Sequence, residues 1–173
     1  MPNILETDRL ILRQFTTGDA AFILELLNEP SFIRFIRDSG VRTLAGATEY
    51  LVNGPLASYD RHGFGLYLTK LKANDVPIGM CGLLKRAGLA DVDLGFAFLP
   101  RYWSQGYATE AASAVLDYGH TILGLKRIVA ITAPDNHGSI NVLKKIGLRF
   151  DKLITLSNDG GDSLLFTRDG LGG

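Results

Sequence analysis

The sequence has a single cysteine, Cys81, which excludes an internal disulfide. Its 18 basic and 18 acidic side chains give a formal net charge of zero, so it lacks the basic excess typical of proteins that bind nucleic acid. No apolar run approaches the length of a membrane span, and the N-terminal stretch MPNILETDRL lacks the basic and apolar regions of a signal peptide. These absences predict a cytoplasmic protein that binds neither nucleic acid nor membrane.

Metal-binding signatures are missing as well. His62, His120 and His137 are not spaced as metal ligands, and no zinc or haem motif accompanies them. Cys81 lies in an apolar segment, where a buried and unreactive thiol is expected. We therefore expect no metal site.

The chain does have enough residues for one domain with a sizeable core: 173, of which 46% are apolar. It has no internal repeat, linker or low-complexity tract, so residues 1–173 are expected to form a single mixed α/β domain. The predicted order is strand, helices, antiparallel meander, helix, strand, helix and hairpin. The expected strands are 9–15, 63–72, 76–86, 91–99, 127–133, 152–157 and 163–168, the last two joined by the turn signal Asn158-Asp159-Gly160-Gly161; the expected helices are 20–29, most of 31–60, about 106–123 and 139–146.

The most informative stretch is RYWSQGYATEAA, residues 101–112, which follows a predicted strand and opens a predicted helix. Backbone N–H groups at a helix N-terminus carry partial positive charge and suit a phosphate or pyrophosphate. Gly106 permits close approach of backbone and ligand, and the small Ala108 keeps the first turn open. The alternative is an ordinary strand–helix connection, because short glycine patterns are weak motifs. The spacing fits neither a dinucleotide-binding fingerprint nor a P-loop.

This stretch resembles the acetyl-CoA pyrophosphate loop of the GNAT superfamily of N-acetyltransferases. Gly106 and Ala108 occupy the last two fixed places of the family pattern, and Trp103 stands where arginine or glutamine is usual, a departure typical of the RimJ/RimL-like branch. Three longer segments are similar to that branch, and the resemblance spans nearly the whole chain in the right order. They are ETDRLILR, DLGFAFLPRYWSQGYATEA, and Asn136-His137-Gly138-Ser139 followed by KKIGLRF.

The resemblance implies an acyl-CoA N-acyltransferase fold, with a mostly antiparallel mixed sheet of about seven strands and helices on both faces. Strands 92–99 and 127–133 would splay apart at their C-terminal ends, and the pantetheine arm of acetyl-CoA would lie in the gap. An amide near Phe96 or Ala97 would polarise the thioester carbonyl. The implied cofactor-binding residues are Phe96, Ala97 and Phe98 in the strand, Trp103, Ser104, Gln105, Gly106, Tyr107, Ala108 and Thr109 in the loop, and Asn136 and Asn141 beyond it.

Ser139 and Asp93 are the implied catalytic residues. Many family members carry a tyrosine general acid where this chain has Leu143, and Ser139 is the substitute that the branch suggests. Ser139 could instead only cap the helix that follows it, and Asn136 could serve only turn chemistry. Asp93 stands where relatives carry a glutamate and is predicted to act as general base, directly or through water, the alternative being an ordinary exposed charge. Glu110 suits the first turn of a helix because of the helix dipole.

The implied function is acetyl transfer from acetyl-CoA to an amine, by direct attack in a ternary complex. An acceptor of low pKa, such as a protein N-terminal α-amine, is expected, because only a short aspartate is available as base. Residues 31–65 and 155–165 are expected to shape the acceptor pocket, and the protein is expected to be a monomer or homodimer. A non-catalytic acyl-CoA-binding module on the same fold is the alternative. A nucleotide-binding module is disfavoured by the missing P-loop lysine.

Overall fold

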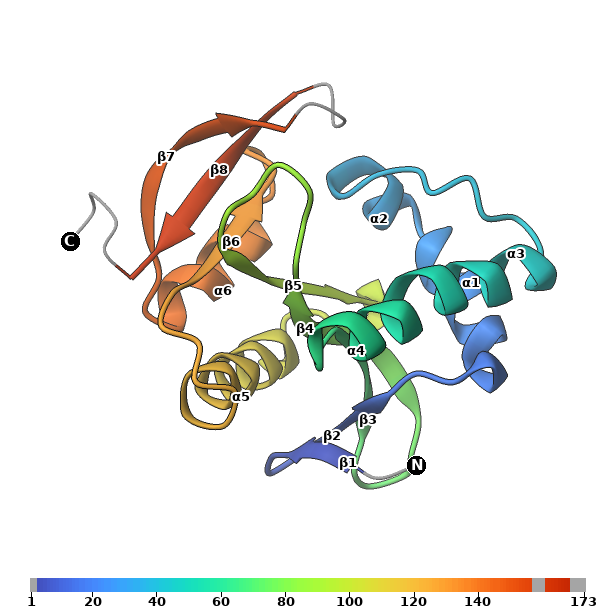
Figure 1. The fold of residues 1–173 in the computed structure, drawn as a ribbon. Helices are drawn as coiled ribbons and strands as arrows, with labels where there is room; N and C mark the ends of the chain where they lie inside the picture. The colour runs from blue at the N-terminus through green and yellow to red at the C-terminus, as the bar shows by residue number, and fades with distance from the viewer. Residues whose placement is uncertain (1–2, 157–160, 169–173) are drawn as a thin grey trace.

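A mixed eight-stranded sheet forms the centre of the structure, a computed structural model that describes residues 3–156 and 161–168 (Figure 1). Its order is β1-β2-β3-β4-β5-β6-β8-β7, and only the β5–β6 pair is parallel. The strands are β1 (Asn3–Glu6), β2 (Leu10–Gln14), β3 (Leu66–Leu71), β4 (Pro77–Leu84), β5 (Val92–Phe98), β6 (Ile128–Thr132), β7 (Arg149–Thr155) and β8 (Asp162–Thr167). The helices are η1 (Thr17–Asp19), α1 (Ala20–Leu27), α2 (Pro30–Phe35), α3 (Leu44–Leu51), the π-helical η2 (Val52–Leu56), α4 (Ala57–His62), η3 (Pro100–Tyr102), α5 (Tyr107–Thr121) and α6 (His137–Lys145).

The predicted elements are confirmed, with ends that differ by a few residues. All seven predicted strands are present, and β7 pairs with β8 as the predicted hairpin, although turn residues 158–160 lie outside the described residues. The count of about seven strands is corrected to eight, because β1 is a four-residue edge strand that pairs only with β2. The helical reading of 31–60 is correct in kind, but it comprises α2, α3, η2 and α4, with an irregular segment after α2.

Helices cover both faces of the sheet, as the family resemblance implies. Helices α5 and α6 pack on one face, in a core that includes Leu94 and Phe98 of β5. On the other face, α1, α2 and α3 pack against a second core that includes Ala97 and the following Leu99. Strand β5 therefore contributes alternate residues to two separate cores and is covered on both sides.

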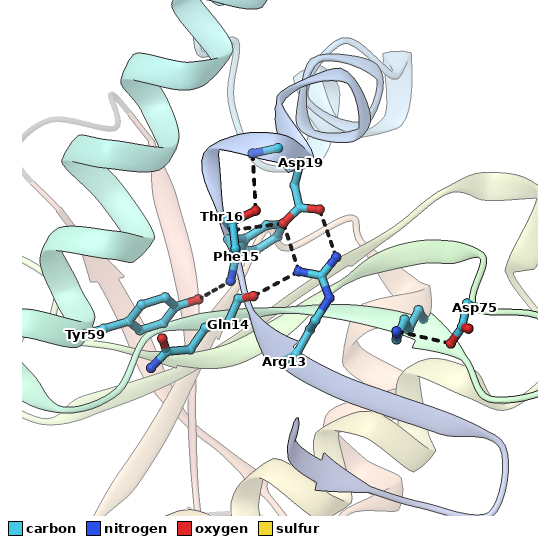
Figure 2. Close-up of polar contacts among 9 residues, drawn as sticks. Arg13, Gln14, Phe15, Thr16, Asp19, Tyr59 and Asp75 are labelled. Carbon is cyan, nitrogen blue, oxygen red and sulfur yellow. Dashed lines mark hydrogen bonds and ion pairs between the residues drawn. The ribbon is translucent and has the colours of Figure 1, made fainter. Parts of the chain in front are cut away.

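Polar contacts attach the helical layer to the end of β2 (Figure 2). Arg13 forms two hydrogen bonds of 2.9 Å with the carboxylate of Asp19, whose Oδ2 also accepts from the Thr16 backbone. The Tyr59 hydroxyl, from α4, accepts from the Phe15 N–H at 3.1 Å and donates to the Leu66 carbonyl of β3. These contacts fix where the chain leaves the sheet to form α1.

The sheet divides between β5 and β6. The two strands pair at only two positions, Val92 with Ile128 and Asp93 with Val129. Beyond Asp93, β5 continues to Phe98 without a partner on that side, whereas β6 pairs with β8 on its other edge. The predicted splay is therefore confirmed, and we call the opening between the strands beyond these two pairs the fork.

A substitution at Gly82 tests how closely β4, which supports β5, packs against the neighbouring strand β3. A Cβ atom at Gly82 would lie 2.0 Å from the Gly65 carbonyl oxygen, at the start of the neighbouring strand. Because this obstacle is backbone, we expect Gly82→Ala to lower the free energy of unfolding in urea by about 3 kcal/mol. Gly54→Ala is the control, since nothing lies within 4 Å of its Cβ position. Equal losses in both variants would contradict this account.

Candidate active site

The fork opens into a cleft of about 720 Å³. Its walls come from the end of β5, the loop and first turn of α5, the start of α6, and α2. Most of the residues predicted to form the site line this cleft, namely Phe96, Ala97, Phe98, Trp103, Ser104, Gly106, Tyr107, Ala108, Thr109, Asn136, Ser139 and Asn141. Gln105 and Asp93 are not part of the lining.

The edge of β5 that faces the fork carries backbone groups without a strand partner. Leu99 donates its N–H to the carbonyl of Ile78, a residue of β4. Hydrogen-bonding positions alternate along an antiparallel pair, so the Ala97 amide also faces β4, whereas the amides of Phe96 and Phe98 face the fork. Of the two amides suggested by the sequence, that of Phe96 is the one available to a ligand in the cleft.

The loop between β5 and α5 follows a tight path. Ser104 and Gly106 both have left-handed backbone conformations, with φ of 61° and 85°. The Trp103 Nε1 donates to the Phe98 carbonyl at 2.8 Å, which holds the loop against the end of β5. Gln105 turns away from the cleft, and its side-chain amide donates to the Arg101 carbonyl at 3.2 Å. Contact between Gln105 and the cofactor stays a prediction, and its side chain lies outside the cleft lining.

Helix α5 begins without a side-chain cap. Its N-cap is Gly106, and the first hydrogen bond of the helix runs from the Glu110 N–H to the Gly106 carbonyl. The amides of Tyr107, Ala108 and Thr109 precede that bond, and all three residues line the cleft. Such free amides at the positive end of a helix dipole form a site for an anion.

Asn136, rather than Ser139, caps α6. The Asn136 Oδ1 accepts from the Ser139 backbone N–H at 3.2 Å, and the helix begins at His137. The alternative in which Ser139 is the N-cap is therefore wrong. The cap engages the oxygen of the Asn136 amide and leaves its Nδ2 group to donate elsewhere. Leu143, at the place of the family's tyrosine acid, is buried in the core and cannot act in its stead.

Asp93 lies at the last position where β5 and β6 pair, and only 1% of it is exposed. The alternative of an exposed surface charge is therefore wrong. Its Oδ2 accepts from the Arg86 Nε at 2.9 Å, and its Oδ1 is buried without a hydrogen-bond partner in the described structure. Burial raises the pKa of Asp93 to about 6. The positive charge and hydrogen bond of Arg86, and the polar backbone of Ile131 nearby, act in the opposite direction and lower it by less. At the base of the fork, this carboxyl group can exchange a proton near neutral pH.

Helix α2 forms a wall of the cleft that no motif in the sequence marks. Phe32, Phe35 and Ile36 line it, together with the acidic Glu29. Arg34 of α2 forms an exposed ion pair with Asp135, before α6, at 3.4 Å. Of residues 31–65, only Ser31, Phe32, Phe35 and Ile36 line this cleft, and no described residue of 155–165 does. That these two segments shape the acceptor pocket stays a prediction.

Comparisons with known proteins agree with this geometry. A family model described as an acetyltransferase (GNAT) domain matches residues 9–149. The chain belongs to the GNAT family of acetyltransferases. It is 30% identical over 166 residues to YnaD of Bacillus subtilis, an uncharacterised N-acetyltransferase, with 94% of each chain covered.

Solved structures of GNAT acetyltransferases share the fold. A GNAT-family acetyltransferase from Bacillus anthracis is 25% identical, with a TM-score of 0.79 over 94% of this chain and 96% of that one. RimL, a ribosomal α-N-protein acetyltransferase solved in complex with coenzyme A, is 15% identical, with a TM-score of 0.82 over 96% of this chain and 97% of that one. The RimJ/RimL-like GNAT fold predicted from the sequence is thereby confirmed.

The described part of the chain, residues 3–156 and 161–168, has neither a membrane-spanning helix nor a cluster of metal ligands. No helix there combines the length and apolar character needed to cross a bilayer. Within the same residues, no three His, Cys, Asp or Glu side chains gather where they could hold a metal ion. Cys81 is buried as predicted, and burial raises the pKa of its thiol.

The raised pKa of Asp93 makes the stability of this GNAT protein depend on pH. The pKa of Asp93 is about 6 in the folded chain and 3.8 in its ordinary state. The folded state therefore binds this proton more tightly, so stability falls as pH rises from about 4 to 6. The Asp93→Asn variant has no titrating group at this position. Between about pH 4 and 6, its free energy of unfolding should therefore rise by about 3 kcal/mol relative to that of the parent. Urea unfolding at pH 4 and pH 7.5 measures this gain, and a difference that is the same at both pH values would contradict it.

Proposed function

We propose that the protein transfers an acetyl group from acetyl-CoA to an α-amine, such as a protein N-terminus, by direct attack in a ternary complex. The observation that carries the proposal is the uncapped start of α5 beside the unpaired edge of β5, in one cleft. An anion site and a row of free strand amides lie next to each other there. That combination suits a long thioester cofactor whose pyrophosphate and pantetheine arm need both.

Each part of the cleft has a proposed task in binding acetyl-CoA, which supplies an activated acyl thioester. The amides of Tyr107, Ala108 and Thr109 would bind the pyrophosphate, and the left-handed Gly106 allows close approach. The fork-facing amide of Phe96 would donate to the thioester oxygen as negative charge develops on it. The Asn136 Nδ2 would donate to the pantetheine arm, and Asn141 would lie beside it.

Asp93 is the proposed general base. It does not line the cleft, so it would receive the proton through water at the base of the fork. Transfer to a carboxylate of pKa about 6 costs roughly 2.5 kcal/mol from an α-ammonium group of pKa near 7.8, and roughly 6 kcal/mol from a lysine ammonium. This difference favours an α-amine as the acceptor.

Ser139 is the proposed proton donor to the departing thiolate. Ser139 lies in the first turn of α6 and lines the cleft. A cysteine-type thiol has a pKa of about 8.5, so the thiolate leaves readily and needs little help from an acid. Ser139 therefore has a minor role, and the burden of proton transfer falls on the base.

The α2 wall supports the proposed acceptor. Phe32, Phe35 and Ile36 offer apolar contact for the first side chain of a peptide, and Glu29 places an acidic residue in the same wall. RimL, which shares the fold, is by name an acetyltransferase of α-amines on ribosomal protein. The apolar contacts favour a peptide N-terminus over a highly charged polyamine, and Glu29 could attract the ammonium group of either acceptor.

The cofactor half of the proposal is tested at Gly106. A β-branched residue cannot adopt its φ of 85°, so Gly106→Val should reduce CoA affinity at least tenfold in calorimetry, by displacing the amides of α5. Gly124→Val is the matched control. Gly124 has a similar φ of 69°, open space around its Cβ position, and a place beyond the far end of α5. Unchanged CoA affinity in Gly106→Val would place the anion site elsewhere.

The base is tested by the pH dependence of kcat/KM for an α-amine peptide. In the parent, kcat/KM should level off above about pH 6, when Asp93 is ionised. In Asp93→Asn it should keep rising until the amine itself loses its proton near pH 8, so the loss is about a hundredfold at pH 6 and small above pH 8. Asp91→Asn is the control, since Asp91 forms a partly exposed ion pair with Arg127. Overlaying profiles for parent and Asp93→Asn would remove Asp93 from the mechanism.

The acceptor is tested with two peptides of equal length. One has a free α-amine and no lysine, and the other has a blocked N-terminus and one internal lysine. The free α-amine should be preferred by at least a hundredfold in kcat/KM near neutral pH, because of the difference between the two amine pKa values. Preference for the lysine peptide would contradict the proposed acceptor and leave the acetyl-CoA site unaffected.

A further inference from the structure

The N-terminal stretch ETDRLILR has no place in the chemistry described so far, yet it contacts the cofactor loop. Arg9 lies between β1 and β2, and its Nη1 donates to the Gln105 carbonyl at 2.9 Å. Its guanidinium also covers the Tyr107 ring, with 4.3 Å between Cζ and the ring centroid. Arg9 is not part of the cleft lining. Among the described hydrogen bonds of residues 103–107, only that from Arg9 comes from a side chain outside the segment 98–110.

Arg9 also pairs with Glu110 in the first turn of α5. The Arg9 Nε lies 2.7 Å from Glu110 Oε1, and the Arg9 backbone N–H donates to Oε2 at 3.0 Å. The Thr7 hydroxyl donates to the same Oε2. Burial alone would raise the pKa of Glu110, but these hydrogen bonds hold it below the ordinary value. Glu110 is therefore ionised at neutral pH, and Arg9 neutralises it.

The charge of Glu110 matters because of its place in the helix. An isolated carboxylate in the first turn of α5 would be favoured by the dipole, but it would repel a pyrophosphate bound at the same turn. The arginine that neutralises this carboxylate also holds the carbonyl just before Gly106. One side chain thus controls both the shape of the loop and the charge beside it.

We propose that Arg9, supported by Thr7 and Glu110, is a positioning residue that holds the 103–107 loop in its pyrophosphate-binding shape. The inference rests on the proposed function, because it assumes a CoA pyrophosphate at the start of α5. It assigns to the ETDRLILR stretch a role in cofactor affinity rather than in proton transfer. Arg9 itself touches neither the acetyl group nor the amine.

The experiment compares kcat/KM for acetyl-CoA and for S-acetylpantetheine, which lacks the pyrophosphate. Arg9→Gln should raise KM for acetyl-CoA about tenfold, with kcat and the KM for the amine unchanged. With S-acetylpantetheine, Arg9→Gln and the parent should be equal. Arg42→Gln, which removes the arginine of an exposed ion pair with Asp38, is the control for loss of one positive charge and should match the parent with both donors.

Two further comparisons separate positioning from direct contact and from misfolding. Acetyl-dephospho-CoA lacks the 3′-phosphate but keeps the pyrophosphate, so Arg9→Gln should lose the same tenfold with it. A loss seen only with acetyl-CoA would mean that Arg9 binds the 3′-phosphate, and would overturn the positioning role. An equal loss with S-acetylpantetheine would mean general damage to the fold, and would overturn it too.

The double variant Arg9→Gln/Glu110→Gln tests whether Arg9 also acts by neutralising the charge of Glu110. Because it leaves no uncompensated carboxylate, it should bind CoA more tightly than Arg9→Gln in calorimetry. If the double variant binds CoA no more tightly than Arg9→Gln, the claim that Arg9 acts by neutralising Glu110 is overturned. Unchanged CoA affinity in Arg9→Gln would overturn the inference while the proposed function stands. A parent protein that does not bind CoA would overturn the proposed function, and this inference with it.

Discussion

The early separation of β5 from β6 is the constraint on which the site depends. Backbone amides inside a sheet need partners, and a strand that loses its neighbour exposes them. Here β5 loses β6 after Asp93 and keeps β4, so one edge of a well-supported strand faces an open cleft. The carboxyl group at the point of separation is buried with one oxygen unpartnered. The same geometry thus provides free donors along the fork and a group with a raised pKa at its base.

Packing of side chains holds β5 and β6 in place on either side of the fork, where hydrogen bonds between the two strands are missing. One core runs from Leu10 of β2 through α5 to Phe166 of β8, and so joins the two parts of the sheet. Gly119 lets α5 approach closely, since a Cβ there would lie 2.5 Å from the Cδ1 of Ile128, at the start of β6. Helix α5 therefore supports both strands from one face and presents its N-terminus at the mouth of the cleft.

The parts of the fold that could be predicted are those with a local signal. Strand β5 alternates apolar residues strictly, and α5 repeats its apolar residues at helical spacing, so the sequence predicts both elements and the face that each buries. Strand β1 has four residues and depends on pairing with β2, and such a short stretch has no periodicity to detect. Alternation also puts Asp93 on the face opposite Leu94, but a local pattern cannot indicate that helices bury that face, and the sequence therefore leaves an exposed charge as an alternative.

The site was predictable only where a motif carried it. The 103–109 loop and the Asn136–Ser139 turn have distinctive sequences, whereas the apolar residues of α2 look the same in a core helix and in a cleft wall. Which residue caps α6 depends on where the helix starts, and asparagine and serine are both good N-caps, so the sequence alone does not separate Asn136 from Ser139. Arg9 and Glu110 are 101 positions apart, so no local rule could pair them.

The strand order also determines when the cleft can form during synthesis. Strand β8 lies between β6 and β7, and β6 pairs with β8 at three positions and with β5 at two. A nascent chain that ends before Asp162 lacks β8 and leaves β6 with its two pairs to β5, so one wall of the fork has no supporting strand. The residues proposed to bind the pyrophosphate, 103–109, are synthesised before β8, and they have no complete cleft until that strand is inserted. Until then, β6 has an unpaired edge where β8 will lie, and an edge of this kind can pair with another nascent chain.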